Sequence, residues 1–504
     1  MSRASPWDKI TRANQASQRH LSPYHPAVAR SHLYGNDLPL TDSQSSLTRG
    51  LAMVHPPDPE VLDRERRWLA EIEKRGFWSR SVALLGRGGP GYLQSAMTLG
   101  GGSVSASLLA GAAFGFQLLW VAPLGMLIGT IMMAAIAHQT LSTGMRPFEA
   151  MRVHAGGVFA WGWAIGALVA SIVWHFAQYS LASAVMVDMG DAAGADLPRG
   201  AAGVLILIWA VFTAQAFGTR SRWTALFDRG LKIMIWLIVI SFGLVAFKAG
   251  VDDPGAILRG FTTFQVPDDR GDVTSAALII SGLAAAVGVN MVFLYPYTLL
   301  ARGWGKGHRR LARFDLGFGM LLPYIFATSL ITIAAAGTIH TDFQGTGISP
   351  VEAAKTLAGV IGPVWGRLIF QLGILSMVLT TITMHMICAG FCCSEMFGWE
   401  FGSLKYRLAV LLPTPGVLGC FFWSEMSVWI AVPTSIVAGF LLPLAYLGFL
   451  KLQRSRAYLG DALPTGARGM AWFGGMVLAT AVIIAFLGWY LLTRGPAFLE
   501  RFGM

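Results

Sequence analysis

The stretch Leu99-Gly100-Gly101-Gly102-Ser103 lies inside an otherwise apolar segment, residues 91–115, that is long enough to cross a lipid bilayer. Each of three consecutive glycines disfavours a helix by about 1 kcal/mol relative to alanine. A broken helix in hydrocarbon is tolerated only where its unpaired backbone groups are buried in protein or line a cavity. The stretch therefore predicts a membrane-spanning helix whose break lines a cavity.

A second apolar segment, residues 276–301, has a similar weak point at Val287-Gly288-Val289-Asn290, which is followed by Pro296. Two interrupted spans in corresponding halves of a chain are typical of the binding site of a secondary transporter. The alternative is that the glycines only allow neighbouring helices to pack closely. The pairing of the two stretches favours the transporter interpretation.

Composition indicates a polytopic membrane protein, because 54% of the 504 residues are hydrophobic and only 13% are charged, against about 25% in soluble proteins. The net charge of +11 comes from basic residues between the apolar spans, without an aromatic-interleaved patch, which argues against nucleic-acid binding. The four cysteines all fall in apolar segments and predict neither a disulfide framework nor a zinc finger.

The sequence predicts four regions. Residues 1–57 are rich in Ser, Pro, Arg, His and Gln and are expected to form a disordered cytoplasmic tail. Residues 58–88 have apolar residues at helical spacing, as in an amphipathic helix at the membrane surface or one packed on cytosolic loops. Residues 89–450 would form a transporter core, and residues 470–492 an additional transmembrane helix.

About eleven membrane spans are predicted from apolar runs of roughly 20 residues. The ninth is the weakest, since it contains Pro413 and Pro415. The predicted spans are 91–115, 118–138, 157–187, 201–217, 233–247, 276–301, 316–336, 368–397, 408–423, 428–450 and 470–492.

Loop charges predict the orientation. Basic residues gather after the even-numbered spans, whereas the opposite loops, such as residues 188–196 and 268–272, hold aspartates. By the positive-inside rule we expect an inner-membrane protein with a cytoplasmic N-terminus. An odd number of spans then places the C-terminus outside.

No enzyme motif is present, since the sequence has no GxSxG, HExxH or Walker loop, and we expect neither catalysis nor a cofactor. Ionisable residues within spans are functional candidates, and here they are His138, His175, His385 and Glu395. His175 is a candidate proton relay because an unperturbed imidazole titrates near pH 6.5. The alternative is a neutral histidine that is hydrogen-bonded to a neighbouring helix.

The run Met384–Cys388, followed by Cys392 and Cys393, allows two interpretations. His385, Cys388 and Cys392 share one helix face, and their imidazole and thiolate groups suit copper or zinc. Met and Cys are also ordinary apolar packing residues.

The first span resembles a known family through Gly89-Pro90-Gly91-Tyr92-Leu93-Gln94-Ser95, the glycine stretch, Leu109-Ala110-Gly111-Ala112 and Gln117-Leu118-Leu119-Trp120-Val121. These residues look like the opening of the Nramp (natural resistance-associated macrophage protein) family, proton-coupled divalent-metal transporters with the LeuT-type fold. The resemblance implies an all-α fold with two inverted five-helix repeats, about 91–247 and 276–450. The substrate would bind between the broken first and sixth spans.

The chain departs from the motifs of the family it resembles, so the resemblance implies substrate-binding and proton-pathway positions but not their usual residues. The Asp-Pro-Gly-Asn motif falls on Gly100, Gly101, Gly102 and Ser103, and the Met-Pro-His motif on Gly288, Val289 and Asn290. The tenth-helix polar position falls near Ser435, and the proton-pathway positions near His175 and Gln178. We therefore expect a site of neutral oxygens that lacks the family's anionic and thioether ligands.

A divalent cation at the membrane midplane needs charge compensation or must keep its hydration shell. A hard or hydrated cation such as magnesium is thus a more plausible substrate than manganese or iron. The alternatives are a carrier for a small polar organic solute and a transport-inactive membrane sensor or scaffold. The expected partners are a small ion or small molecule and the lipid bilayer, and the oligomeric state is left open.

Overall fold

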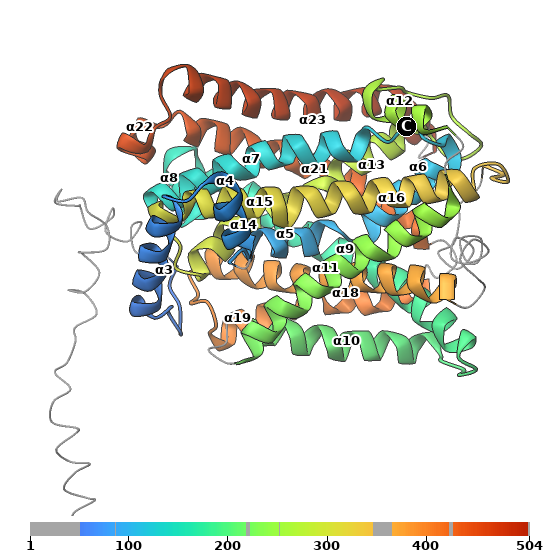
Figure 1. The fold of residues 1–504 in the computed structure, drawn as a ribbon, viewed down its shortest axis with the longest axis horizontal. Coiled ribbons are helices and arrows are strands. Elements are labelled where there is room, and N and C mark those ends of the chain that lie inside the picture. The colour runs from blue at the N-terminus through green and yellow to red at the C-terminus, as the bar shows by residue number, and fades with distance from the viewer. Residues whose placement is uncertain are drawn as a thin grey trace, which may run out of the picture. The chain divides into compact units, whose positions relative to one another are not determined.

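The computed structural model describes residues 51–85, 87–217, 222–250, 253–345, 365–422 and 427–501, which belong to one compact unit. Residues 1–50 of the predicted tail lie outside the described residues. The described part is helical apart from two isolated β-bridges (Figure 1). The α-helices are α3 (Pro59–Ile72), α4 (Phe77–Leu85), α5 (Pro90–Thr98), α6 (Gly101–Phe114), α7 (Val121–Thr143), α8 (Pro147–His154), α9 (Gly157–Ala192), α10 (Arg199–Ala216), α11 (Arg222–Ala249), α12 (Pro254–Thr262), α13 (Ser275–Ala286), α14 (Val289–Ala301), α15 (Arg309–Leu316), α16 (Leu322–Thr338), α18 (Trp365–Phe397), α19 (Leu404–Ala409), α20 (Gly419–Phe422), α21 (Ser427–Gln453), α22 (Arg456–Leu459) and α23 (Gly466–Arg501).

The first span is broken, as predicted. Helix α5 ends at Thr98, α6 begins at Gly101, and the two are bent by 53°. The break itself consists of Leu99 and Gly100, whereas Gly101, Gly102 and Ser103 form the first turn of α6. Glycine is less costly there than in a helix interior, since the first N–H groups of a helix have no partner within the helix.

The sixth span is also interrupted where the sequence predicts it. Val287 and Gly288 are extended between the end of α13 and the start of α14. Helix α5 packs against α14, and helix α6 packs against α13. The first half of each broken span thus lies beside the second half of the other, which is the arrangement of two spans that run antiparallel (Figure 1).

Nine described helices are long and apolar enough to cross a membrane, and the bent pair α5–α6 makes a tenth. The prediction of a spanning helix at 408–423 is wrong. Its described residues, up to 422, form the end of α19, a series of turns, the 3₁₀-helix η4 (Thr414–Leu418) and the short α20. The two prolines explain this, since each removes a backbone donor and restricts its neighbour.

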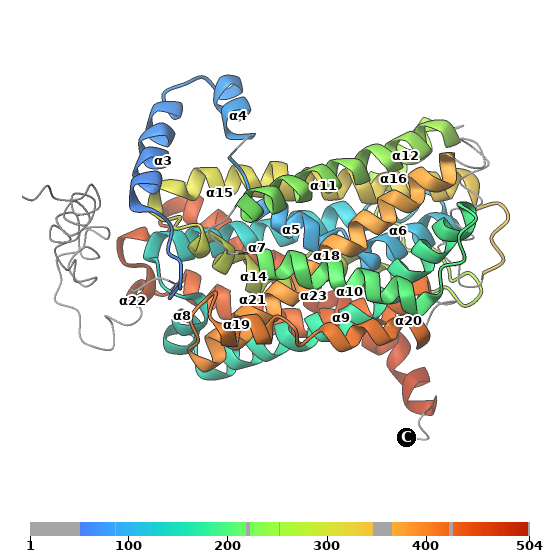
Figure 2. The same ribbon diagram turned by 90° about the horizontal axis from the view of Figure 1, so that it is seen from below.

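This irregular segment nevertheless follows the whole length of α10. At one end the side chain of Gln215 donates a hydrogen bond of 2.9 Å to the carbonyl of Arg407. At the other end Gly203 faces Cys420 and Gly200 faces Phe421. Figure 2 shows α19 and α20 at opposite ends of the bundle. The path therefore runs from one end of the bundle to the other without a continuous helix.

Residues 58–88 form two helices rather than one amphipathic helix. Asp58 caps the start of α3, which buries Leu69 and Ile72. Helix α3 is docked on the start of α15 and on the 3₁₀-helix before it, η2 (Lys306–His308), because Glu73 lies 3.1 Å from Arg310 and Glu65 lies 3.7 Å from His308. Helix α4 instead exposes its apolar side chains, Phe77, Trp78 and Val82.

The seventh span contains a π-helical turn, η3 (Gly317–Leu321), between α15 and α16. Just before it, a carboxylate oxygen of the buried Asp315 accepts hydrogen bonds from the backbone N–H groups of Gly89 (3.1 Å) and Gly91 (2.6 Å). This contact fixes the start of α5 against the seventh span, and so positions the first half of the broken helix.

Candidate functional site

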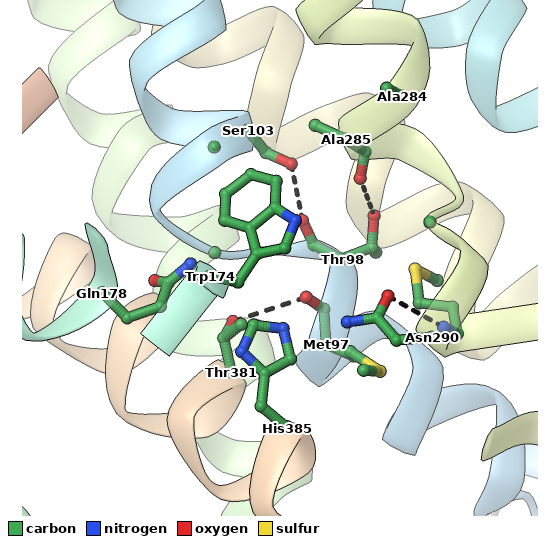
Figure 3. A pocket seen from close by; sticks show the side chains of 14 residues that line it. Met97, Thr98, Ser103, Trp174, Gln178, Ala284, Ala285, Asn290, Thr381 and His385 are labelled. Atoms are coloured by element: carbon green, nitrogen blue, oxygen red, sulfur yellow. Dashed lines mark hydrogen bonds between the residues drawn. The ribbon is translucent and has the colours of Figure 1, made fainter. Parts of the chain in front are cut away.

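A cavity of about 20 Å³ lies between the two helix breaks, α9 and α18 (Figure 3). It has room for about one water-sized particle. Its lining residues come from six helices and the two breaks, and they are Met97, Thr98, Gly100, Gly102, Ser103, Trp174, Gln178, Ala284, Ala285, Gly288, Asn290, Met291, Thr381 and His385.

The glycines of the first break are required by close approach of other helices. A Cβ on Gly102 would overlap the ring of Trp174 on α9, and a Cβ on Gly100 would lie 2.5 Å from the hydroxyl of Thr381 on α18. Any larger side chain would displace these neighbours. The glycine stretch is therefore explained by packing against α9 and α18 as well as by the break.

Hydroxyl groups satisfy the carbonyls that the breaks leave without helical partners. Ser103 donates to the carbonyl of Thr98 at 2.5 Å, and the hydroxyl of Thr98 lies 2.9 and 2.7 Å from the carbonyls of Ala285 and Ala286 (Figure 3). One hydroxyl chain thus links α6, the end of α5 and the end of α13. It joins the two broken spans directly.

Helices α9 and α18 also bind the break between α5 and α6 through hydrogen bonds to its backbone. The Thr381 hydroxyl lies 3.1 Å from the carbonyl of Ala96 and 3.2 Å from that of Leu99. The amide oxygen of Gln178 accepts a 2.8 Å hydrogen bond from the N–H of Gly101. Because Gly101 occupies this oxygen, the amide nitrogen of Gln178 is the group left for the cavity that Gln178 lines.

Of the predicted substrate-binding residues, Gly100, Gly102, Ser103, Gly288 and Asn290 line the cavity. The other three lie beside it.

Gly101 is bound to Gln178, and Val289 is the buried first residue of α14. Ser435 on α21 donates to the carbonyl of Ala431 and lies 3.0 Å from where a Cβ on Gly102 would be. These three residues therefore support the two breaks without lining the cavity.

The structure brings together two histidines that the sequence analysis treated separately. His175 on α9 and His385 on α18 are buried with ring centroids 5.8 Å apart, and Tyr179 packs on the other side of His175 at 5.4 Å. His385 lines the cavity and His175 lies behind it. Neither ring nitrogen of His175 has a hydrogen-bond partner among the described residues.

The soft-metal interpretation of the run from Met384 is not supported in the described residues, which contain no group of three or more His, Cys, Asp or Glu side chains able to hold a metal ion. Cys388 donates to the carbonyl of Asn290 at 3.4 Å and lies 3.9 Å from Cys392. The expectation that no thioether is present is wrong, however. Met97 and Met291, which fall outside the aligned motif positions, both line the cavity.

Sequence reasoning missed Trp174, Thr98 and Thr381 as site residues. Their signals were weak but present. Thr380, Thr381 and Thr383 crowd one apolar span, and Thr98 stands immediately before the glycine stretch. Hydroxyls beside a predicted break are the groups that would satisfy its free carbonyls.

Comparison with known proteins agrees with this geometry. Residues 91–493 match the family described as "Natural resistance-associated macrophage protein-like", Nramp. The chain belongs to the Nramp family. It is 25% identical over 427 residues, 81% of its length, to the "Divalent metal cation transporter MntH" of Mycobacterium tuberculosis (strain ATCC 25618 / H37Rv), covering 92% of that protein.

Other relatives of this Nramp chain extend the likeness. It is 24% identical over 460 residues to the "Metal transporter Nramp1" of Oryza sativa subsp. japonica, covering 85% of this chain and 84% of the relative. A crystal structure of the Eremococcus coleocola manganese transporter superposes with a TM-score of 0.65 at 14% identity, covering 88% and 90% of the two chains. The expected LeuT-type fold of a multi-pass membrane protein is confirmed.

The site of this Nramp chain is polar but holds no carboxylate, lysine or arginine among its described lining residues. The donors offered to a substrate are backbone and hydroxyl oxygens, two amides, one imidazole and two thioethers. The site is therefore formally neutral.

Proposed function

We propose that this chain is a secondary active transporter that carries a divalent metal cation, bound between the breaks of its first and sixth spans. The observation that carries this proposal is the cavity at the two breaks, where each broken helix has its terminal carbonyls. Relatives that cover most of the chain are named divalent metal cation transporters. Rocking of one helix bundle against the other would release the ion.

A neutral site selects among cations by their cost of dehydration and by ligand softness. Carbonyl, hydroxyl and amide oxygens suit magnesium, whereas thioethers favour softer ions. We propose magnesium, because the oxygens lie at the breaks themselves and no carboxylate in the described lining offsets the charge of a bare transition metal. Met97 and Met291 make manganese the competitor to test.

The test is calorimetric titration of the purified protein with magnesium, manganese and calcium, followed by uptake into proteoliposomes. Asn290→Ala removes a lining amide, and we expect it to weaken the binding of magnesium. Ser171→Ala is the control, since this buried hydroxyl of α9 bonds only within its own helix in the described contacts. No detectable heat of binding for any of the three ions, together with no uptake into proteoliposomes, would contradict the proposal.

A specific contact favours a second candidate, a carrier for a small polar organic solute. The amide oxygen of Asn290 is occupied by the N–H of Met291 at 3.0 Å, and its amide nitrogen is directed into the cavity (Figure 3). With Gln178 held in the same way, the cavity offers amide donors beside the ring of Trp174. Donors and an aromatic face suit an acceptor-bearing solute better than a cation. A thermal-shift screen of such solutes would follow a negative ion titration.

We further propose that transport is proton-coupled through His175, with Gln178 joining that route to the break. The pair His175–His385 supports this, because unpartnered imidazole nitrogens lie next to the cavity. His175→Gln should abolish uptake driven by an inward proton gradient and leave substrate binding intact. His138→Gln, at a carbonyl of Ala462 away from the cavity, is the control. Gradient-driven uptake by His175→Gln would exclude the route.

A further inference from the structure

A second cavity of about 20 Å³ lies between α6, α7, α13 and α16, and only Ser103 is shared with the first. Its distinctive feature is a set of side-chain hydroxyls in an otherwise apolar lining. They belong to Ser103, Ser107, Tyr324, Thr328, Ser329 and Thr332.

Three of these hydroxyls, those of Ser103, Thr328 and Thr332, donate their protons to backbone carbonyls. Ser103 donates to the carbonyl of Thr98, Thr328 donates to that of Tyr324 at 2.7 Å, and Thr332 lies 3.0 and 3.2 Å from the carbonyls of Thr328 and Ser107. A hydroxyl whose proton is engaged presents its lone pairs. The cavity therefore offers acceptors, which attract a cation and repel an anion.

One hydroxyl points to a missing ligand. The oxygen of Ser329 is buried and has no hydrogen-bond partner among the described residues, although Ser329 lines the cavity. A buried polar atom without a partner costs about 1–3 kcal/mol. An occupant of the cavity would remove that cost.

The charge of the occupant follows from the lining, in which no described side chain is charged and which, unlike that of the first cavity, includes no residue of either helix break whose carbonyls could offset a double charge. The cost of transferring an ion from water rises with the square of its charge, so a divalent ion pays about four times as much as a monovalent one. Hydroxyl oxygens are also hard ligands. We propose that this cavity, the hydroxyl cavity, binds one alkali cation, with Na⁺ as the test ion.

Because Ser103 belongs to both cavities, the ion would contact the hydroxyl chain that joins the broken spans. Its use as a coupling ion rests on the proposed transport function, but its binding does not.

The test measures the melting temperature of the full-length protein in detergent with NaCl, KCl or N-methyl-D-glucamine chloride at equal ionic strength. A bound ion stabilises the folded state in a saturable way, so we expect the melting temperature to rise with Na⁺ or K⁺ concentration and to level off. The bulky organic cation, which the cavity cannot hold, should give no such rise.

Three variants locate the effect. Thr332→Val removes a cavity hydroxyl at nearly constant volume and should weaken the alkali-ion dependence at least tenfold in concentration. Thr332→Ser keeps the hydroxyl and should keep the dependence, even if the protein is less stable. Thr338→Val is the control: it removes a hydroxyl of the same helix that bonds to the carbonyl of Ala334 outside the cavity. This variant should keep the alkali-ion dependence.

An alkali-ion effect that survives in Thr332→Val, or equal melting temperatures in all three salts, would overturn the proposal. The result is separable from the proposed function. Alkali-ion stabilisation without divalent-ion flux would leave the hydroxyl cavity standing and the metal-transport proposal refuted. Divalent-ion flux without alkali-ion stabilisation would support the metal-transport proposal and refute the alkali-ion proposal for the hydroxyl cavity.

Discussion

At the scale of single residues, Gly102 shows how α9 shapes the site. The ring of Trp174 occupies the space that a side chain at Gly102 would fill, and Ser435 closes the same space from α21. The backbone of α6 is thereby packed directly on an aromatic face. The first turn of α6 cannot move relative to α9 without uncovering this contact.

We predict that Gly102→Ala destabilises the protein by about 1–3 kcal/mol and abolishes transport, because the new methyl group would overlap the ring of Trp174. The melting temperature in detergent and proteoliposome uptake measure the two effects. Gly474→Ala is the control, since α23 leaves open space at that position. It should be neutral or stabilising by up to about 1 kcal/mol. Equal shifts of the melting temperature in the two variants would contradict this prediction, because they would show that the ring of Trp174 moves aside without destabilising the protein.

The residues of the site were predictable in proportion to their proximity to the breaks. Glycines in an apolar run are visible without a structure, because they contradict helix propensity. Trp174 and Thr381 are not visible in this way, since each is an ordinary residue of a membrane helix until folding brings it to the break. Their position depends on which helices meet, which a single sequence does not encode locally.

At the scale of elements, Asp315 determines where α5 begins. Its carboxylate accepts two backbone N–H groups of α5 across 224 and 226 residues of sequence, and the π-helical turn that follows brings the seventh span against Tyr92. A carboxylate at a helix N-terminus is stabilised by the helix dipole and by charge-assisted hydrogen bonds. Asp315 therefore acts as an N-cap supplied by a distant span.

We predict that Asp315→Asn lowers stability by about 1–3 kcal/mol, since the amide keeps one acceptor but loses the charge. Asp253→Asn is the matched control, because Asp253 also caps a helix, α12, but at an exposed position next to Arg259. Its melting temperature should stay close to that of the unaltered protein. A larger shift for Asp253→Asn than for Asp315→Asn would contradict the assigned role.

A third prediction concerns α3 and pH. His308, whose Nε2 lies 3.7 Å from the carboxylate, and the positive charges of Arg87 and Arg302 lower the pKa of Glu65 below its usual value of 4.5, against the opposing effect of burial. A lowered folded-state pKa stabilises docking of α3 above the unfolded-state pKa, and this stabilisation is lost as the pH falls through the folded-state value.

The protection of α3 against hydrogen exchange, measured relative to the intrinsic rate at each pH, is therefore expected to stay high from neutral pH down to about 4.5 and to fall at lower pH. Glu65→Gln should exchange faster at neutral pH and lose this dependence. Glu71→Gln, which alters an exposed residue of the same helix, should behave as the unaltered protein. Protection of α3 that does not change as the pH falls below 4.5 would exclude Glu65 as the docking residue.

The predictions of secondary-structure elements were best where a long apolar run of sequence forms one continuous helix. Nine helices and the bent pair match predicted spans, because about 20 apolar residues suffice to cross the bilayer. The ninth prediction failed as a helix, since apolar content says nothing about backbone continuity at Pro413 and Pro415. The division of residues 58–88 into α3 and α4 was missed because both parts share one helical periodicity.

At the scale of the whole molecule, the two ends of the bundle differ in charge. Helices α3, α8, α19 and α22 lie at one end (Figure 2). Contacts confirm this, since His154 of α8 stacks near Tyr458 of α22, and Val54 bonds to the carbonyl of Phe401 before α19. This end carries Arg146, Arg152, Lys405, Arg407, Arg454 and Arg456, whereas the loops after α9 and α12 carry Asp191, Asp196, Asp268, Asp269 and Asp272. The positive-inside rule predicts that the basic end is cytoplasmic.

The position of the C-terminus tests this orientation together with the irregular ninth segment. If residues 404–422 cross the membrane along α10, α21 returns to the basic end and α23 leaves it, which places the C-terminus outside. A green fluorescent protein fused at the N-terminus, or inserted after Arg454, should fluoresce, and alkaline phosphatase fused after Met504 should be active. Active phosphatase inserted after Arg454 would mean that the ninth segment does not cross. The contact of α22 with α8 would then be impossible in the membrane, because the two would lie on opposite sides.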